Sequence, residues 1–224
     1  MKLGVLFSGG KDSYLAMHLA SEEHVISCLL TIDSSNQDSW MFHTPAIKLT
    51  KLQSKSLGIP QIIQDTEGIQ DEELDDLFKL VKNAKDKYSI EGIITGALAS
   101  TYQSTRIQKI CNKLGLWCFN PLWQLSQEKL LDKLQTYKIT SIVTGVAAEP
   151  FDESWLGKEL DSAVINELLS LSKKYRINPA GEGGEFESLV INAPMFAKRL
   201  EIISSEIHYS NFAGRLDIKE AKLI

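Results

Sequence analysis

The segment Ser8-Gly9-Gly10-Lys11-Asp12-Ser13, called here the 8–13 loop, carries the residue types with the clearest chemistry. It follows a short apolar run, Leu3 to Phe7, and precedes Tyr14 to Glu23, where apolar residues recur at helical spacing. Glycines let a backbone approach a ligand closely, and the first amides of a helix point outward without partners. With a lysine and serine hydroxyls added, the loop is suited to bind an anion with several oxygens, such as phosphate or pyrophosphate.

A tight Gly-Gly turn capped by Asp12 or Ser13 would explain the same segment without a ligand. That alternative treats the turn lysine and the strand that begins next to Met1 as coincidences. The spacing also differs from the Walker pattern, G-x-x-x-x-G-K-[ST], because only three loop residues precede the lysine. We therefore expect a phosphate-bearing ligand to be bound by Ser8, Gly9, Gly10, Lys11, Asp12 and Ser13.

The second informative stretch is Gly181-Glu182-Gly183-Gly184-Glu185-Phe186-Glu187, called here the acidic segment. Carboxylates this close together repel one another unless water, a cation or hydrogen bonds offset the repulsion. One interpretation is an exposed turn that leads into a strand at 188–191. The other places the glutamates in a crevice, as cation binders or general bases.

A third stretch, Thr95 to Arg106, has Ser100 or Thr101 as a helix cap and the arginine past the first turn. Exposed helical arginines are common, but an arginine that shares a crevice with Lys11 could clamp phosphate oxygens. His43 follows two aromatic residues and either lines the core or contacts substrate. The additional candidates for cofactor binding are Gly96, Ser100 and Arg106, and those for substrate binding are His43, Tyr102, Gly183, Gly184 and Phe186.

Alternating strands and helices must position these segments. Strands are expected at 3–7, 24–32, 59–64, 91–95 and 117–119, and helices at 14–23, 46–57, 70–88 and 101–114. This order predicts an α/β fold with a doubly wound, mostly parallel five-stranded sheet and right-handed crossovers. Ligands of such sheets bind at the carboxyl ends of the strands, so the loops at 8–13 and 95–102 would share one crevice if their strands are neighbours.

The pattern changes after residue 122. Helices are expected at 127–137 and 157–175, and strands at 139–146, 188–191 and 199–209. We interpret this part as a smaller α+β domain, which gives expected domains at 1–122 and 123–224.

Composition limits the classes of function. Of 224 residues, 43% are hydrophobic and 24% charged, as in ordinary globular proteins. The net charge of −5 argues against non-specific nucleic-acid binding as the main activity. Cys28, Cys111 and Cys118 are widely spaced, which favours reduced, buried thiols over a disulfide framework or a zinc site. No apolar run reaches membrane-spanning length and no signal peptide precedes the first strand, so we expect a cytoplasmic protein without a membrane partner.

The motifs together resemble one family. S-G-G-K-D-S at 8–13 is similar to the pyrophosphate loop of the ATP pyrophosphatases, whose sheet is of the adenine nucleotide alpha hydrolase (HUP) type. Across nearly the whole chain the sequence resembles the diphthine–ammonia ligase family. The motifs that carry this resemblance are M-F-H at 41–43, L-Q-S-K-S-L-G-I-P at 52–60, G-A-L-A-S-T-Y-Q at 96–103, L-G-L at 114–116, P-L-W at 121–123 and G-E-G-G-E-F-E at 181–187.

The resemblance implies the last step of diphthamide synthesis on elongation factor two. ATP would activate the diphthine carboxylate as an acyl-adenylate with loss of pyrophosphate, and ammonia would then displace AMP. Residues 1–122 would bind ATP and residues 123–224 the acceptor. Lys11 would stabilise the departing pyrophosphate, and Asp12 would help to hold Mg²⁺. Glu182, Glu185 and Glu187 would form a negative pocket and supply a general base, with the ring of Phe186 facing the methylated nitrogen of diphthine.

The nitrogen donor is expected to be free ammonium. Glutamine-dependent amidotransferases carry a nucleophilic cysteine, and position 2 here is Lys2, with no spare length for a second catalytic domain. Two alternatives remain: a tRNA-modifying adenylase of the same superfamily, and a nucleotide-binding sensor without catalysis. The acidic balance and the absence of C-x-x-C weigh against the first. A homodimer is compatible with the sequence, which does not specify an oligomeric state.

Overall fold

The five expected strands of the first part form one parallel sheet. A computed structural model of the chain describes residues 1–34, 46–67 and 72–224. The strand order is β3-β2-β1-β4-β5, with every neighbouring pair parallel. The strands are β1 (Lys2–Leu6), β2 (Val25–Ser34), β3 (Gln61–Thr66), β4 (Gly92–Ile94) and β5 (Trp117–Phe119). The predicted parallel, doubly wound sheet is therefore confirmed, with its third strand two residues later than expected at both ends.

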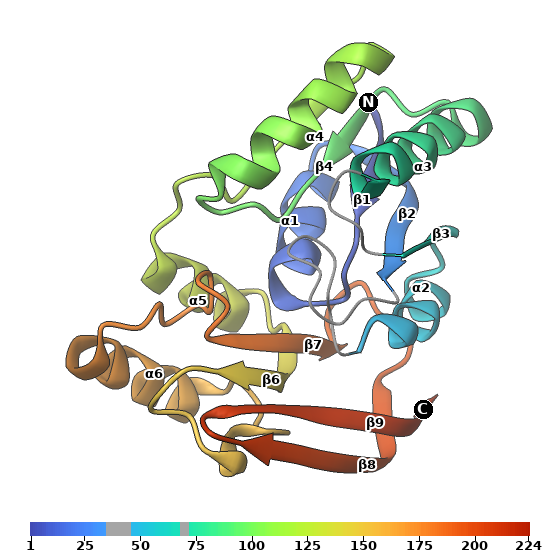
Figure 1. The fold of residues 1–224 in the computed structure, drawn as a ribbon. Coiled ribbons are helices and arrows are strands. Elements are labelled where there is room, and N and C mark those ends of the chain that lie inside the picture. Colours follow the sequence, from blue (N-terminus) through green and yellow to red (C-terminus); the bar gives the residue numbers. More distant parts are fainter. Residues whose placement is uncertain (35–45, 68–71) are drawn as a thin grey trace.

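Helices cover both faces of this sheet, which is why β1 is buried (Figure 1). One apolar cluster joins β1 to α1 and contains Leu3, Val5 and Leu15. A second cluster, on the other face, joins residues of β2 and β4 to α3 and α4. The helices are α1 (Lys11–Ser21), α2 (Thr50–Leu57), α3 (Glu72–Tyr88) and α4 (Thr101–Leu114), with a short 3-10 turn, η1 (Ile47–Leu49), before α2.

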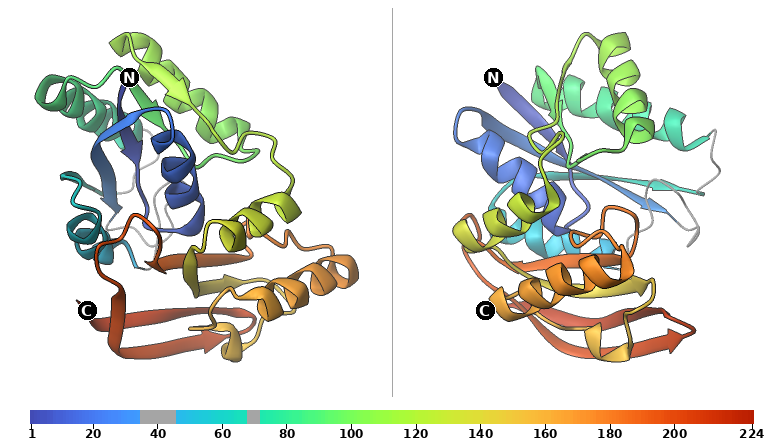
Figure 2. Two further views of the ribbon diagram at one scale, coloured as in Figure 1. Left: turned by 180° about the vertical axis from the view of Figure 1, so that it is seen from behind. Right: turned by 90° about the vertical axis from the view of Figure 1, so that its left-hand side faces the viewer.

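The second part is built on an antiparallel sheet of order β7-β6-β9-β8. Its elements are α5 (Gln127–Thr136), β6 (Thr140–Ala147), η2 (Glu153–Trp155), α6 (Ser162–Tyr175), β7 (Phe186–Asn192), β8 (Leu200–Ser210) and β9 (Ala213–Leu223). The expected smaller α+β part is confirmed. Figure 2 shows the long β8–β9 hairpin on the side away from the parallel sheet.

Two expectations for this part were wrong in detail. The helix expected from residue 157 begins at Ser162, because the Asp161 carboxylate caps it by accepting a hydrogen bond from the Val164 amide at 2.8 Å. Strand β9 was not predicted at all. Its turn, Asn211-Phe212, has φ angles of 51° and 61°. Sequence patterns predict such a turn from a glycine at the second position, and this chain has a phenylalanine there.

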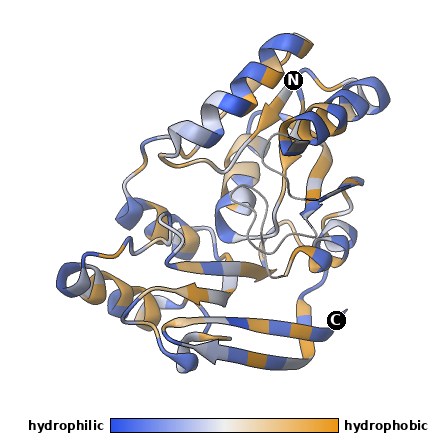
Figure 3. Ribbon diagram, viewed as in Figure 1, coloured by the Kyte–Doolittle hydropathy of each residue, from blue (hydrophilic) through white to orange (hydrophobic). Residues whose placement is uncertain are grey.

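The two parts share a core. Helix α1 packs between the parallel sheet and the second part, in a cluster that also contains Leu131, Val190 and Phe196. The Tyr14 hydroxyl accepts a hydrogen bond from the Met195 amide at 3.2 Å. In Figure 3 apolar residues follow the strands beside α1. This shared core fixes β7 next to the start of α1.

The three cysteines form no disulfide. Cys28 and Cys111 are buried as predicted, whereas Cys118 is only half-buried. No helix in the described ranges is long and apolar enough to cross a bilayer.

Candidate active site

The 8–13 loop lies at the carboxyl end of β1 and leads into α1. Gly9 adopts a φ of +80°, and Gly10 caps the helix in an extended conformation without a side-chain hydrogen bond. Neither Asp12 nor Ser13 caps the helix; the Ser13 hydroxyl instead donates to the Gly10 carbonyl at 3.1 Å. Among the described residues the amides of Asp12 and Ser13 have no hydrogen-bond acceptor. The geometry is that of an anion-binding helix start.

The loop after β4 packs against this helix start. Strands β1 and β4 are direct neighbours, with Val5 opposite Ile94, so their carboxyl ends meet at the same edge. A Cβ atom on Gly96 would lie 2.9 Å from the Ser13 amide nitrogen. Only glycine allows this approach. The loops at 8–13 and 95–102 therefore lie in contact at one edge of the sheet, as expected for neighbouring strands.

Lys11 is buried, with 3% of its surface exposed, and its ammonium has two partners. Its Nζ lies 2.8 Å from Oδ2 of Asp12 and 5.1 Å from the ring centroid of Phe186. The other carboxylate oxygen of Asp12, Oδ1, is buried and has no partner in the described part of the chain. A buried acceptor without a donor is costly, and a cation bound there would satisfy it. Asp12 therefore fits the expected magnesium ligand.

The three glutamates of the acidic segment have different surroundings. Glu185 accepts from the amides of Asn178 and Gly183, both at 2.8 Å, so its carboxylate braces its own loop. Glu182 accepts from the Ala99 amide at 3.1 Å and thereby joins the acidic segment to the loop after β4. The carboxylate of Glu187, on β7, makes no hydrogen bond to any described residue. Glu187 alone has a carboxylate that no protein donor occupies.

The protonation of these groups follows from burial. Burial raises the pKa of the Glu187 carboxyl to about 7, although the Lys11 cation opposes the shift. Burial also raises the pKa of Glu182, with the Asp12 carboxylate adding to the shift and the amide of Ala99 opposing it. Glu187 therefore exchanges a proton near neutral pH, which suits a general base.

In the third predicted stretch, Thr95 to Arg106, the structure shows the expected helix cap but no contact between the arginine and the 8–13 loop among the described residues. The Ser100 hydroxyl caps α4 by accepting from the Gln103 amide at 3.3 Å, as expected. The guanidinium carbon of Arg106 lies 3.3 Å from the ring centroid of Tyr102. No hydrogen bond or ion pair joins Arg106 to the 8–13 loop among the described residues. Gly183 and Gly184 lie exposed in the acidic segment, whereas His43 lies outside the described residues.

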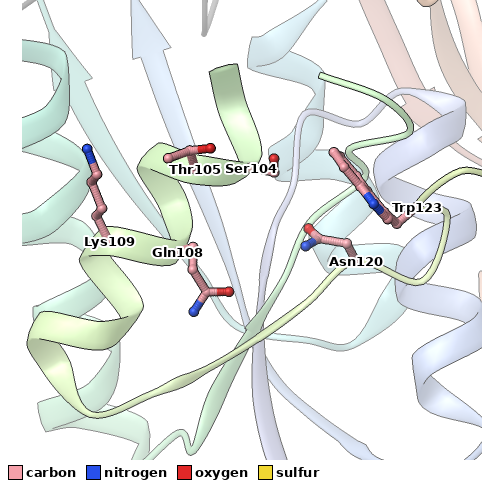
Figure 4. Close-up of a pocket in the computed structure, with 6 residues that line it drawn as sticks. All are labelled: Ser104, Thr105, Gln108, Lys109, Asn120 and Trp123. Carbon is pink, nitrogen blue, oxygen red and sulfur yellow. The ribbon is translucent and has the colours of Figure 1, made fainter. Parts of the chain in front are cut away.

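Phe186 is buried at the start of β7, against Phe151, with the ammonium of Lys11 over its ring. The cation that contacts this ring in the structure is therefore Lys11, whereas the sequence predicted a contact with the methylated nitrogen of the substrate. A separate hollow of about 480 Å³ lies between α4 and the chain after β5 (Figure 4). None of the predicted site residues lines it; the lining residues are Ser104, Thr105, Gln108, Lys109, Asn120 and Trp123.

Sequence reasoning missed the residues that hold the 8–13 loop in place. The Ser188 hydroxyl accepts from the Lys11 amide at 3.2 Å, and the Val190 amide donates to the Gly9 carbonyl at 2.9 Å. Gln53, on α2, also donates to that carbonyl, at 2.9 Å. The available signal was a face of α2 on which polar residues recur at every third position, Thr50, Gln53 and Ser56, all of them buried.

Comparison with known proteins assigns the chain to a family. The family model described as the diphthamide synthase N-terminal domain matches residues 1–118, and the diphthamide synthase C-terminal domain matches residues 126–224. The chain belongs to the diphthamide synthase family. The resemblance inferred from the motifs is thus confirmed.

Similar proteins from several organisms are named diphthine–ammonia ligase. The bovine protein is 34% identical over 227 residues, which cover 92% of this chain and 85% of the relative. The human protein is 34% identical over 230 residues, with the same two coverages. The Schizosaccharomyces pombe protein is 34% identical over 238 residues, but the chain spans only 39% of its length. The family is one of enzymes, and the chain is a ligase of this family.

Among solved structures, the chain is similar to a predicted subunit of tRNA methyltransferase from Methanocaldococcus jannaschii. The identity is 19% and the TM-score 0.45, and the match covers 87% of this chain and 98% of the other.

Proposed function

We propose that the chain converts diphthine on elongation factor two to diphthamide, using ATP and ammonium and releasing AMP and pyrophosphate. One observation carries the proposal. The buried Lys11 at an anion-binding helix start interacts electrostatically with Glu187, a carboxylate without a hydrogen-bond donor that β7 supplies from the other part of the chain. Such a site combines what a phosphate-releasing activation and a proton-accepting amidation require. Residues 1–122 would bind ATP and residues 123–224 the acceptor, with β7 serving both.

In the first half-reaction the diphthine carboxylate oxygen would bond to the α-phosphorus of ATP while the bond to pyrophosphate breaks. The free amides of the 8–13 loop and the ammonium of Lys11 would stabilise the charge that develops on pyrophosphate. Oδ1 of Asp12 would hold Mg²⁺, which supplies charge neutralisation on phosphate oxygens when bound. Ser100 would keep the loop after β4 in position by capping α4.

In the second half-reaction ammonium would transfer a proton to Glu187. The ammonia formed would bond to the acyl carbon while the bond to AMP breaks, and the nitrogen would lose its second proton to the phosphate of the departing AMP. Glu182 would hold the acidic segment against the first part of the chain through the Ala99 amide. Glu185 would keep that segment folded. Tyr102, His43 and the exposed Gly183 and Gly184 would contact the acceptor.

The direct test is an incubation of the purified chain with ATP, ammonium and diphthine-bearing elongation factor two, followed by mass analysis of the modified histidine. The proposal expects replacement of the carboxylate OH by NH₂ together with AMP release. ATP binding without AMP release would point to a sensor. AMP release with transfer-RNA substrates, and none with the factor, would point to a tRNA-modifying adenylase.

The nitrogen donor gives a separate prediction. Glutamine is expected not to replace ammonium, because its hydrolysis would need a reactive cysteine and the cysteines of the chain are buried or half-buried. Amide formation is measured with glutamine after enzymatic removal of ammonia. Product formed by the chain alone under these conditions would contradict the prediction.

We place the reaction in the cytoplasm. That the chain forms a homodimer stays a prediction.

A further inference from the structure

Gln53 is a buried polar residue for which the proposed reaction gives no chemical role. It lies in the middle of α2, and none of its surface is exposed. Its Nε2 donates to two backbone carbonyls, that of Gly9 at 2.9 Å and that of Val190 at 2.8 Å. The amide of Val190 donates to the same Gly9 carbonyl at 2.9 Å. One side chain thus joins the 8–13 loop, α2 and β7.

The hydrogen-bonding capacity of the Gln53 carboxamide is only partly used. Its Oε1 is buried and has no hydrogen-bond partner among the described residues. An unsatisfied buried acceptor lowers the free energy of unfolding, and this cost offsets part of what the two hydrogen bonds of Nε2 contribute. The oxygen also lies where a Cβ atom on Gly9 would approach it to 2.4 Å, so the carboxamide packs directly against the loop. A local cost of this kind is expected at residues that serve a functional site.

The peptide bond between Gly9 and Gly10 explains what the carboxamide does. A trans peptide is planar, and its N–H points away from its C=O. Because Gln53 and Val190 hold the carbonyl of Gly9 on one side, the amide of Gly10 must face the other side. That amide makes only a long contact, 3.4 Å, with the Ser8 hydroxyl. It is therefore available to a ligand at the start of α1.

We infer that Gln53 is a positioning residue for phosphate binding, which fixes the Gly9–Gly10 peptide so that the Gly10 amide faces the pyrophosphate portion of ATP. The inference rests on the proposed function, since it names a residue that serves the same ATP site. Gln53 itself touches neither ATP nor the acceptor.

The test compares ligand affinity by titration calorimetry in the full chain and in Gln53→Met, which keeps the volume and removes the donors. Inorganic pyrophosphate and ATP with magnesium are both expected to bind roughly 10- to 100-fold more weakly, the range for one lost hydrogen bond to a charged group. Adenosine is expected to bind equally to both proteins, because it lacks the phosphates. The turnover number at saturating ATP should change less than the Michaelis constant for ATP.

Ser56→Ala is the matched control. The Ser56 hydroxyl also joins α2 to the second part, through both backbone groups of Lys198, but it does not contact the 8–13 loop. This variant should lose stability and keep its affinity for pyrophosphate. If Gln53→Met does not fold, Gln53→Asn, whose donors are one methylene short, should show the same loss of affinity.

Equal pyrophosphate affinity in the wild type and Gln53→Met would overturn the inference while leaving the proposed function intact. The same would follow if Ser56→Ala lost as much affinity as Gln53→Met. Failure of the wild-type chain to bind both pyrophosphate and ATP would instead overturn the proposed function, and the inference with it.

Discussion

Lys11→Met is expected to slow AMP release by roughly 10²- to 10³-fold, the scale for losing one preorganised group that stabilises developing charge. The ammonium is buried and fixed by Asp12 and the Phe186 ring, so it needs little reorganisation when pyrophosphate departs. Methionine keeps most of the side-chain volume, which limits the packing change. Initial rates of AMP release at saturating ATP and acceptor measure the effect.

Lys158→Met provides the control for this variant. Lys158 also combines an ion pair, 3.4 Å from Glu167, with a ring contact, 4.2 Å from the ring centroid of Trp155. It contacts no residue of the 8–13 loop, so its replacement should leave AMP release unchanged. Equal rates for Lys11→Met and the wild type would mean that the loop is not the phosphate site.

Glu187→Gln is expected to reduce amide formation by roughly 10²- to 10⁴-fold, the range for general-base catalysis. The variant should also change the pH profile. Because the pKa of Glu187 is raised to about 7, wild-type amide formation should increase as the pH rises through about 7, where the carboxylate becomes able to accept a proton. With glutamine this limb should disappear. Rates are compared at a fixed concentration of ammonium, the proposed donor, so that only the titration of the enzyme shapes the profile.

Glu185→Gln separates the base from its neighbours. Its carboxylate accepts from two backbone amides, so its loss should loosen the acidic segment and lower the rate. The limb near pH 7 should nevertheless remain. A profile that loses the limb in Glu185→Gln and keeps it in Glu187→Gln would reverse our assignment of the base.

The same carboxyl should affect stability. The folded chain holds the Glu187 proton up to about pH 7, whereas an unperturbed glutamate loses it near 4.5. Between these values the folded state binds more protons than the unfolded state, so the free energy of unfolding falls as the pH rises. Glu187→Gln should lack this fall. Denaturant unfolding on either side of the window tests it, and parallel curves for both proteins would contradict the raised pKa.

Much of the parallel sheet could be predicted, because each strand is a short apolar run and each crossover a helix with one apolar face. The 8–13 loop was predicted from residue types, whereas its contact with the loop after β4 was expected only if β1 and β4 are neighbours, which the structure shows. The hairpin β8–β9 could not be predicted in full, since Phe212 takes a conformation that sequence patterns reserve for glycine or asparagine.

Within the site, the sequence named all three glutamates but could not rank them. Their roles depend on which backbone amides reach them. The amides of Ala99 and Asn178 lie in separate loops, and the sequence does not show that either one points at a glutamate. The sequence did not predict that Gln53, Ser188 and Val190 support the 8–13 loop, for the same reason. A buried glutamine in a short helix looks like any exposed one until its partners are known.

The distance along the chain between the loop and its supports bears on how the protein is made. Lys11 and Ser188 are 177 positions apart, and Gln53 and Val190 are 137 apart. Contacts between such distant residues close late in folding, because a long loop must be ordered first. During synthesis the 8–13 loop therefore leaves the ribosome long before the strand that shapes it, since 177 positions separate Lys11 from Ser188. The nascent chain should therefore acquire its affinity for ATP only after β7 has been translated and has docked.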